Sequence, residues 1–384
     1  MKNNENNITG YIEGYYGRLL SWESRKLIIK SLSKNKMNTY FYAPKEDIYH
    51  RLLWRKKYSK EWRFGFKKFI QFGKINDIKV IAGIAPGLDF NFNELNGNSN
   101  NNKKTDFQFL LKKAKQLLED GANSIALMLD DIPNDFKNKF GTEISEGTYH
   151  AILANRLAKK LGQKIFFVPR IYADELIKDD PFYLKDLSKT LNPKIKIFYC
   201  GKDVVARTYK NYEKIKKVLS NEIIIWDNFY ANDYCPRRFF IGPTIGRENL
   251  KNILINPTGL IRTDLLILDL FGKSIIGKVS KNKWEHILNN HSVPEKFFKI
   301  KKYFLRPDFG LNPPTQSLKI KIEDIEIIDY LLWKWKGKLS REWYPFLFGL
   351  KQDLQINQKL LTSERIIKSQ SIPLSEFLNK GELI

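Results

Sequence analysis

Residues 124–133 read SIALMLDDIP, a short apolar run that ends in two adjacent carboxylates, Asp130 and Asp131. The composition of the apolar part is typical of a buried β-strand. Proline cannot continue the pairing of a central strand, so Ile132 and Pro133 mark the point where this strand stops. Two neighbouring negative charges at the end of a buried strand need either a compensating environment or a chemical use.

Seven more runs of this kind occur along the chain, with amphipathic helical stretches between them. The eight runs cover residues 8–16, 37–44, 79–86, 124–131, 164–170, 195–201, 222–228 and 252–257. The helical stretches include 22–33, 106–119, 148–161 and 212–219. Eight strands interleaved with helices over about 270 residues have the length and rhythm of a (β/α)8 TIM barrel. An open doubly wound sheet is the alternative, but the glycine-rich phosphate loop that it usually carries is missing after the first strand.

The pattern changes after residue 272. Segments 323–339 and 340–361 show helical periodicity, with no strand-like runs between them. We therefore expect a (β/α)8 barrel over residues 1–272 and a small helical domain over residues 273–384, whose helices are a candidate homodimer surface. RPDFGLNPPTQ (306–316) is expected to be an irregular connection and NELNGNSNNNKK (93–104) a surface loop.

The composition limits the classes of partner and compartment that the chain can be expected to have. The 384 residues carry a formal net charge of +24, which alone would favour a nucleic-acid or anionic partner. The lysines are instead spread over most of the chain, so nucleic acid is not expected as a partner. The two cysteines, Cys200 and Cys235, are too few for a disulfide framework. Without an apolar signal core in residues 1–10 or a run long enough for a membrane span, a cytoplasmic protein with no membrane partner is expected.

Polar side chains follow nearly every predicted strand, where (β/α)8 enzymes carry their catalytic groups. These strand ends hold Glu13, Gly14, Tyr15, Lys45, Glu46, Asp47, Asp89, Asp130, Asp131, Tyr172, Tyr199, Cys200, Trp226, Asp227, Asn228, Asp233 and Asn256. Each has a structural alternative, since an aspartate can cap a helix or turn and Trp226 can fill the core. Their concentration at one rim favours a site. Aromatic rings, amides and a carboxylate pair together suggest glycoside hydrolysis.

Long motifs along the chain then resemble those of a known family. Residues 10–58 contain EGYYGR and NTYFYAPKED, which are similar to the opening signatures of the O-GlcNAcases and bacterial N-acetylglucosaminidases, glycoside hydrolase family 84. ALMLDDI (126–132) resembles the catalytic strand of that family, and IIIWDNFYANDY (223–234) resembles its W-D-N-x-x-A-N-D segment. The resemblance extends over about residues 8–270, and several long motifs in order make it highly specific.

The resemblance implies a retaining β-N-acetylglucosaminidase that works by substrate-assisted catalysis without a cofactor. Asp130 would orient and polarise the 2-acetamido group of the substrate, and Asp131 would be the general acid and base. The implied substrate-binding residues are Gly14, Lys45, Tyr172, Trp226, Asn228, Asp233 and Asn256, with Tyr172 and Trp226 as walls of the acetamido pocket. The chain departs from the family at Leu19–Leu20, Arg170 and Cys200. These departures are expected to affect the shape of the pocket and of the aglycone side, and not the reaction.

In this mechanism the acetamido carbonyl attacks the anomeric carbon, so the enzyme needs no nucleophile. Adjacent side chains of a regular strand point to opposite faces, so the strand should end or bulge at Asp130 and Asp131 to let both enter the pocket. Because neighbouring like charges push one pKa upward, Asp131 is expected to have a raised pKa and to be protonated near neutral pH.

The expected substrate is a glycoprotein or glycan that carries N-acetylglucosamine, with O-linked N-acetylglucosamine on protein Ser or Thr as the first choice. A hydrolase of hyaluronan or another glycosaminoglycan, or of peptidoglycan fragments, is the alternative. A non-catalytic sugar-binding barrel is the second alternative, which the presence of both aspartates disfavours. The four histidines are scattered and no carboxylate cluster has ligand spacing, so no metal is expected.

Overall fold

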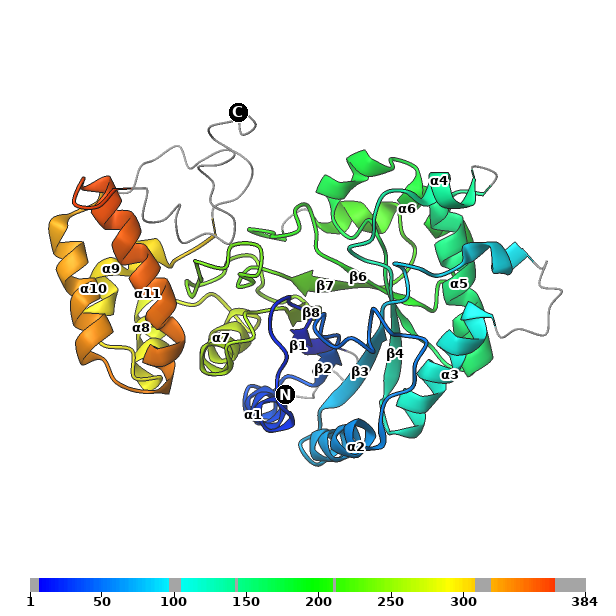
Figure 1. Cartoon of the computed structure of the whole chain (residues 1–384), viewed down its shortest axis with the longest axis horizontal. Coiled ribbons are helices and arrows are strands. Elements are labelled where there is room, and N and C mark those ends of the chain that lie inside the picture. The colour runs from blue at the N-terminus through cyan, green and yellow to red at the C-terminus, as the bar shows by residue number, and fades with distance from the viewer. Residues whose placement is uncertain (1–6, 97–104, 142–143, 210–211, 308–318, 363–384) are drawn as a thin grey trace.

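The computed structural model describes residues 7–96, 105–141, 144–209, 212–307 and 319–362. Eight parallel strands each pair with the next, and β8 pairs with β1, so the sheet is a closed barrel (Figure 1). The strands are β1 (Ile8–Glu13), β2 (Thr39–Tyr42), β3 (Lys79–Ile84), β4 (Ser124–Met128), β5 (Phe166–Val168), β6 (Lys196–Tyr199), β7 (Ile223–Asp227) and β8 (Asn252–Ile255). Closure confirms the predicted (β/α)8 barrel and excludes the open sheet. Each strand lies within its predicted run.

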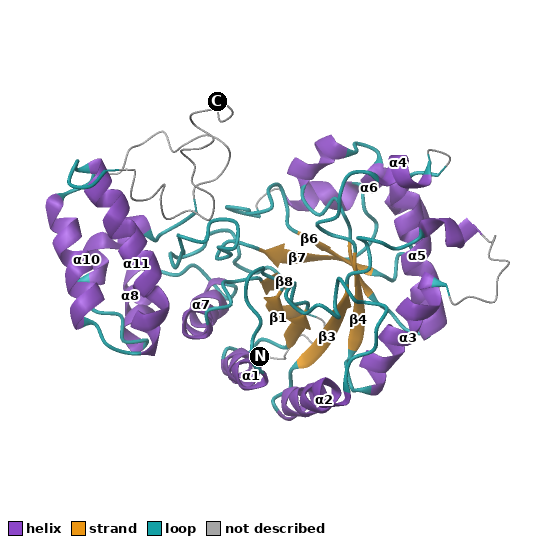
Figure 2. Ribbon diagram, in the orientation of Figure 1, coloured by secondary structure: helices purple, strands orange, loops and turns teal. Residues whose placement is uncertain are grey.

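Helices surround the barrel as predicted (Figure 2). They are α1 (Trp22–Lys34), α2 (Lys60–Ile75), α3 (Asp106–Glu119), α4 (Phe136–Phe140), α5 (Glu146–Leu161), α6 (Tyr183–Thr190) and α7 (Ile261–Ser274), with 3₁₀ helices η1 (Phe92–Asn96), η2 (Asp174–Asp179) and η3 (Tyr212–Lys217). Serine or threonine side chains cap α1, α2, α3 and α5 by accepting a first-turn N–H, which fixes where these helices begin. The helix predicted over 212–219 is instead the 3₁₀ helix η3, the tighter form common in short connections.

The predicted C-terminal helices are present as α8 (Lys281–Asn290), α9 (Phe297–Ile300), η4 (Lys301–Tyr303), α10 (Ile322–Lys334) and α11 (Lys338–Asn357). They lie to one side of the barrel, next to α7 (Figure 1). Trp284, Phe297 and Trp343 form their core together with Leu266 and Leu270 of α7. Because α7 also packs on the barrel through Ile267 and Phe271, it belongs to both cores.

The domain boundary at residue 272 and the homodimer surface stay predictions. Most of the predicted loop 93–104 and of the predicted connection 306–316 lies outside the described residues. None of the helices in the described ranges is long and apolar enough to cross a membrane.

The pleat of the strands sorts side chains between the barrel interior and the surrounding layer. Ile12, Phe41, Met128 and Phe198 fill the interior. Their neighbours, such as Tyr11, face the surrounding layer. The same alternation decides which of the polar residues at the strand ends can reach the centre of the barrel mouth.

Candidate active site

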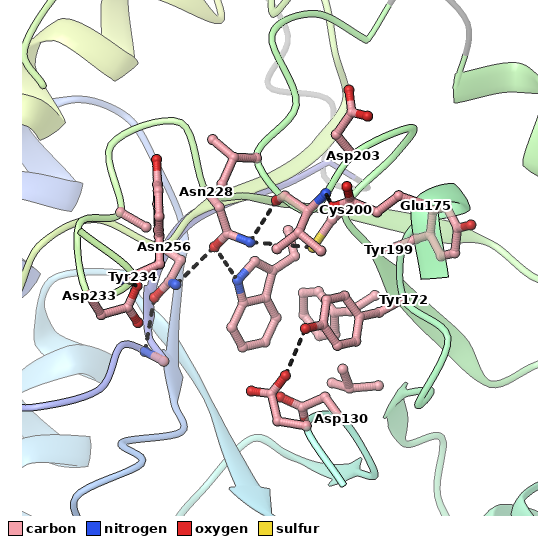
Figure 3. Close-up of a pocket in the computed structure, with 18 of the residues that line it drawn as sticks. Asp130, Tyr172, Glu175, Tyr199, Cys200, Asp203, Asn228, Asp233, Tyr234 and Asn256 are labelled. Carbon is pink, nitrogen blue, oxygen red and sulfur yellow. Dashed lines mark hydrogen bonds between the residues drawn. The ribbon is translucent and has the colours of Figure 1, made fainter. Parts of the chain in front are cut away.

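A cavity of about 790 Å³ opens at the C-terminal ends of the strands, a volume typical of small-molecule sites (Figure 3). All of the predicted site residues line it: Gly14, Lys45, Asp130, Asp131, Tyr172, Trp226, Asn228, Asp233 and Asn256. The structure therefore brings the predicted set together, while the role of each member stays a prediction.

The two aspartates enter the cavity through a change of backbone conformation. Strand β4 ends at Met128, whose side chain faces the barrel interior, and Leu129 packs in the outer layer. Alternation then directs Asp130 inward and would direct Asp131 outward. Asp131 has φ of 52°, in the left-handed region that aspartate tolerates better than most residues, and its side chain lines the cavity. The expected end of the strand before this pair is confirmed.

Lys45 compensates the charge of the pair. Its side chain is only 1% exposed, and its ammonium contacts Asp130 Oδ2 and lies 3.5 Å from Asp131 Oδ2. Asp130 is almost as deeply buried, and its Oδ1 has no hydrogen-bond partner among the described residues. A buried carboxylate oxygen without a partner is unfavourable, so this atom suits a hydrogen-bond donor supplied by a ligand.

Asp131 is held by two tyrosine hydroxyls. Tyr172 donates to Oδ1 at 2.7 Å and Tyr16 donates to Oδ2 at 2.9 Å. Burial by itself would raise the pKa of Asp131, but Lys45, the two hydroxyls and the nearby Arg51 guanidinium together lower that pKa below its ordinary value. The expectation of a raised pKa for Asp131 is therefore wrong, because Lys45 and the two tyrosine hydroxyls outweigh the effects that would raise it.

A buried amide network fixes the wall of the cavity at Trp226. Asn228 Oδ1 accepts hydrogen bonds of 2.9 Å from Trp226 Nε1 and from Asn256 Nδ2. Asn256 Oδ1 in turn accepts the backbone N–H of Gly14 at 3.1 Å. The ends of β1, β7 and β8 are thus joined at one point, with the indole held between them. A Cβ atom on Gly14 would lie 2.5 Å from Trp226 Cζ2, so this position requires glycine.

Asp233 lies across the view from Tyr172, close to Asn256 and Tyr234 (Figure 3). Its Oδ2 accepts the backbone N–H of Tyr16 and its Oδ1 accepts that of Tyr234, each at 3.0 Å. The half-buried carboxylate therefore ties the loop after β1 to the loop after β7.

Several carboxylates at the strand ends prove to be structural. Glu13 pairs with Arg25 of α1 at 2.8 Å, and Asp227 pairs with Arg247 at 3.0 Å, all four side chains being almost fully buried. Asp47 accepts hydrogen bonds from the hydroxyls of Tyr42 and Tyr58. Asp89 accepts from Trp54 Nε1 and Arg55. These groups stabilise the loops that carry the site and do not line the cavity.

Sequence reasoning missed Tyr16 and Arg51, both of which bind Asp131. Tyr16 lies two residues after Gly14 in the EGYYGR motif. Its closeness in sequence to a predicted site residue was the signal that could have identified it. No signal in the sequence pointed to Arg51, because its contact with Asp131 joins residues 80 positions apart. Of the departures from the family pattern, Cys200 lines the cavity, whereas Leu19, Leu20 and Arg170 do not. Arg170 is buried against Glu146 instead, with Nε 2.7 Å from Oε1.

Across the described ranges, no group of three or more His, Cys, Asp or Glu side chains is placed to hold a metal ion. The charges that line the cavity are unlike those of the whole chain. Five lining residues are acidic and two, Lys45 and Lys202, are basic. A chain of net charge +24 thus presents a cavity with an excess of negative charge.

Comparisons with known proteins identify the family of the chain. The model of the beta-N-acetylglucosaminidase family matches residues 9–260. Protein O-GlcNAcase of Rattus norvegicus and that of Mus musculus are each 32% identical over a 265-residue alignment, and each match covers 65% of this chain and 28% of the relative. The match therefore covers less than a third of the length of these relatives.

Two solved structures share the fold. CpGH84B superposes with a TM-score of 0.68 at 24% identity over 98% of this chain and 65% of that one. A mutant of the Thermobaculum terrenum O-GlcNAc hydrolase superposes with a TM-score of 0.68 at 22% identity, over 98% of this chain and 81% of that one. The match of the family model over most of the chain confirms the resemblance seen in the motifs. This chain belongs to the beta-N-acetylglucosaminidase family of glycoside hydrolases, which includes the O-GlcNAcases.

Proposed function

We propose that the chain is a retaining β-N-acetylglucosaminidase that uses substrate-assisted catalysis and removes O-linked N-acetylglucosamine from Ser and Thr of proteins. The observation that carries the proposal is the unequal environment of two adjacent aspartates. Asp130 is buried against Lys45 with one oxygen free to accept a hydrogen bond, whereas the Asp131 side chain is 29% exposed at the cavity. One carboxylate can thus bind a group of the sugar while the other exchanges protons.

Asp130 would act on the acetamido group. Its Oδ1 would accept the amide N–H and so direct the carbonyl oxygen toward the anomeric carbon. As that oxygen forms its bond to the anomeric carbon, positive charge develops on the amide, and the adjacent carboxylate stabilises it. Lys45, whose ammonium contacts Asp130 Oδ2, would hold the Asp130 carboxylate in place.

Asp131 would transfer the protons. It donates one to the glycosidic oxygen as the bond to the anomeric carbon breaks, and the aglycone leaves as an alcohol. Asp131 then accepts a proton from the water that attacks the oxazoline intermediate from the face that the aglycone left. The acetamido group is regenerated and the β configuration is retained, because the anomeric carbon has been inverted twice.

The lowered pKa of free Asp131 implies that substrate binding prepares the acid. We place the acetamido group beside Tyr172 and Trp226, where it can take the hydroxyl of Tyr172 as a hydrogen-bond donor. Asp131 would then lose one of the two hydroxyls that lower its pKa, and the bound sugar would displace water from the cavity. Both changes favour the protonated form.

The charges of the cavity favour a neutral sugar over a polyanion. The excess of acidic lining residues would repel the carboxylates of hyaluronan, although the chain as a whole is basic. We therefore rank a glycoprotein substrate above a glycosaminoglycan. We propose that the activity is cytoplasmic, since the chain has two cysteines, Cys200 and Cys235, which are too few for the disulfide framework of a secreted protein.

A series of substrates with a progressively fluorinated N-acetyl group tests the mechanism. Fluorine withdraws electrons from the carbonyl oxygen, so the rate should fall steadily along the series if that oxygen is the nucleophile. The first product detected by NMR should be the β anomer. An α product, or a rate that ignores fluorination, would contradict the proposal. Turnover of a glycopeptide compared with that of hyaluronan then decides the substrate class.

A further inference from the structure

Arg51 joins the backbone of Asp131 to the side chain that binds its carboxylate. Nη2 of Arg51 donates to the carbonyl oxygen of Asp131 at 2.5 Å. Nη1 donates to the hydroxyl oxygen of Tyr16 at 3.2 Å, and that hydroxyl donates to Asp131 Oδ2 at 2.9 Å. The guanidinium and the tyrosine together therefore contact Asp131 at both its main chain and its side chain.

The main-chain contact matters because Asp131 has an uncommon backbone conformation. With φ of 52° it lies in the left-handed region, which is less stable than the ordinary regions for a residue other than glycine. Without the left-handed turn, the alternation of the strand would direct the carboxylate away from Asp130 and out of the cavity. A donor fixed on the carbonyl of Asp131 stabilises the peptide orientation that this turn requires.

Arg51 is itself held rigidly. It follows His50, whose carbonyl accepts the N–H of Ala85 at 3.0 Å and whose Nδ1 lies 2.9 Å from the carbonyl of Gly83. The loop after β2 is thus hydrogen-bonded to Gly83 of β3 and to Ala85, the residue that follows β3. Arg51 is 9% exposed, and within the described part of the chain no carboxylate lies within 4 Å of its guanidinium. Its positive charge lowers the pKa of the Asp131 carboxyl.

We infer that Arg51 is a positioning residue, which holds Asp131 in its left-handed conformation with its carboxylate directed into the cavity. This inference rests on the proposed function for its kinetic consequences, but not for its structural ones. The titratable and charged groups that face Asp131 are Lys45, Arg51, Tyr16, Tyr172, Asp130 and Cys200. Of the cations in this set, Arg51 is the one that contacts the Asp131 main chain.

The test compares Arg51→Met, Arg51→Lys and, as the matched control, Arg55→Met. Arg55 lies in the same loop and binds Asp89 and Asp106, neither of which lines the cavity. In Arg51→Met the pKa of the Asp131 carboxyl, followed by carbon-13 NMR of the free protein, should rise by about 1 unit because a nearby positive charge is lost. Its kcat on a glycopeptide should fall roughly 10- to 100-fold, with KM changed much less.

Arg51→Lys separates charge from geometry. A lysine ammonium keeps the charge but cannot reach the Asp131 carbonyl and the Tyr16 hydroxyl in the forked manner of a guanidinium. The pKa of Asp131 should therefore stay close to that of the wild type while kcat still falls. Arg55→Met should change neither quantity. If Arg51 had only a structural role, its replacement would lower the melting temperature, but the pKa of Asp131 and kcat would not respond differently in Arg51→Met and Arg51→Lys.

Unchanged pKa and kcat in Arg51→Met, or equal effects in Arg55→Met, would overturn the inference. If Arg51→Met does not fold, Arg51→Lys decides, since a wild-type kcat in that variant contradicts the positioning role and a lowered kcat at an unchanged melting temperature supports it. If the wild type hydrolyses no N-acetylglucosaminide, the proposed function fails, whereas the NMR titration of Asp131 still tests the contact with Arg51.

Discussion

The hydroxyl of Tyr172 donates a hydrogen bond of 2.7 Å to Oδ1 of Asp131. This contact stabilises the carboxylate form of the group that the proposed reaction uses first as an acid. The pKa of Asp131 is accordingly below its ordinary value, since Lys45 and the two tyrosine hydroxyls outweigh the effect of burial. In the proposed mechanism the acid would form when the substrate binds, and Tyr172 would be the residue that responds.

Replacing Tyr172 with Phe should raise the pKa of Asp131 in the free protein, because one donor to the carboxylate is lost. A titration of the Asp131 carboxyl by carbon-13 NMR measures this. Tyr199→Phe is the control, since the Tyr199 hydroxyl donates to Asp174 and does not touch Asp131. The same pKa in Tyr172→Phe and wild type would show that the hydrogen bond does not control the acid.

Replacing Gly14 with Ala should distort the wall of the cavity. The new methyl group would lie 2.5 Å from Trp226 Cζ2, so the indole has to move. We expect kcat/KM to fall by at least about tenfold, as misplaced binding groups commonly cause. Gly277→Ala is the matched control, because a Cβ atom there meets no heavy atom within 4 Å and φ is not positive. Wild-type kcat/KM in Gly14→Ala would refute the role of Trp226 as a wall.

Acid should weaken the contact between α1 and α7 through Asp269. Burial would raise the pKa of this carboxyl, but hydrogen bonds with His291, Asn35 and Lys34 lower it below its ordinary value. The folded state therefore favours the carboxylate, and its contribution is present above about pH 4 and is lost as the pH falls through the lower folded pKa.

Asp269→Asn should lower the free energy of unfolding at pH 7 by about 1–3 kcal/mol, and the difference from wild type should shrink as the pH falls below about 4. Melting temperatures across this pH range measure the effect. Glu23→Gln serves as the control, since the Glu23 side chain is 81% exposed in its pair with Lys26. A difference that grows in acid would mean that the sign of the pKa shift is wrong.

The net charge of +24 should be incidental to catalysis. Salt weakens attraction to a polyanion and has little effect on a neutral substrate. Turnover of a neutral aryl N-acetylglucosaminide should change little with ionic strength, and hyaluronan should be neither bound nor cleaved at low salt. Tight, salt-sensitive cleavage of hyaluronan would reverse the ranking of the two substrate classes.

The barrel and the members of the cavity could be predicted because each depends on local pattern. A β-rich run that ends in polar residues marks both a strand and its C-terminal end, and this signal placed Lys45, Trp226 and Asn256 at one rim. The pleat could also have excluded Glu13 and Asp227. Each is one residue away from a neighbour that faces the barrel interior, so each faces outward toward an arginine.

The electrostatics of Asp131 could not be predicted in this way. Adjacency of two aspartates in the chain indicates repulsion, but the position of Lys45 between them is set by the pairing of β2 with the rest of the barrel. The contacts of Tyr16 and Arg51 with Asp131 span 115 and 80 positions. Only the folded chain determines the sign of the pKa shift.

The division of labour between the two aspartates is tested most directly by leaving-group dependence. Steady-state rates of Asp131→Ala and Asp130→Ala should be measured on aryl N-acetylglucosaminides whose phenols have graded pKa values, and on a glycopeptide. A phenol of low pKa leaves without a proton, whereas a serine hydroxyl does not. Asp131→Ala should therefore keep activity on activated substrates, lose most of it on the glycopeptide, and depend steeply on the leaving group.

Asp130→Ala should be poor on every substrate and depend less on the leaving group, because the acetamido group is left unoriented and its developing charge unbalanced. Equal slopes for the two variants, or a steeper slope for Asp130→Ala, would show that the roles are reversed or that the acetamido group is not the nucleophile.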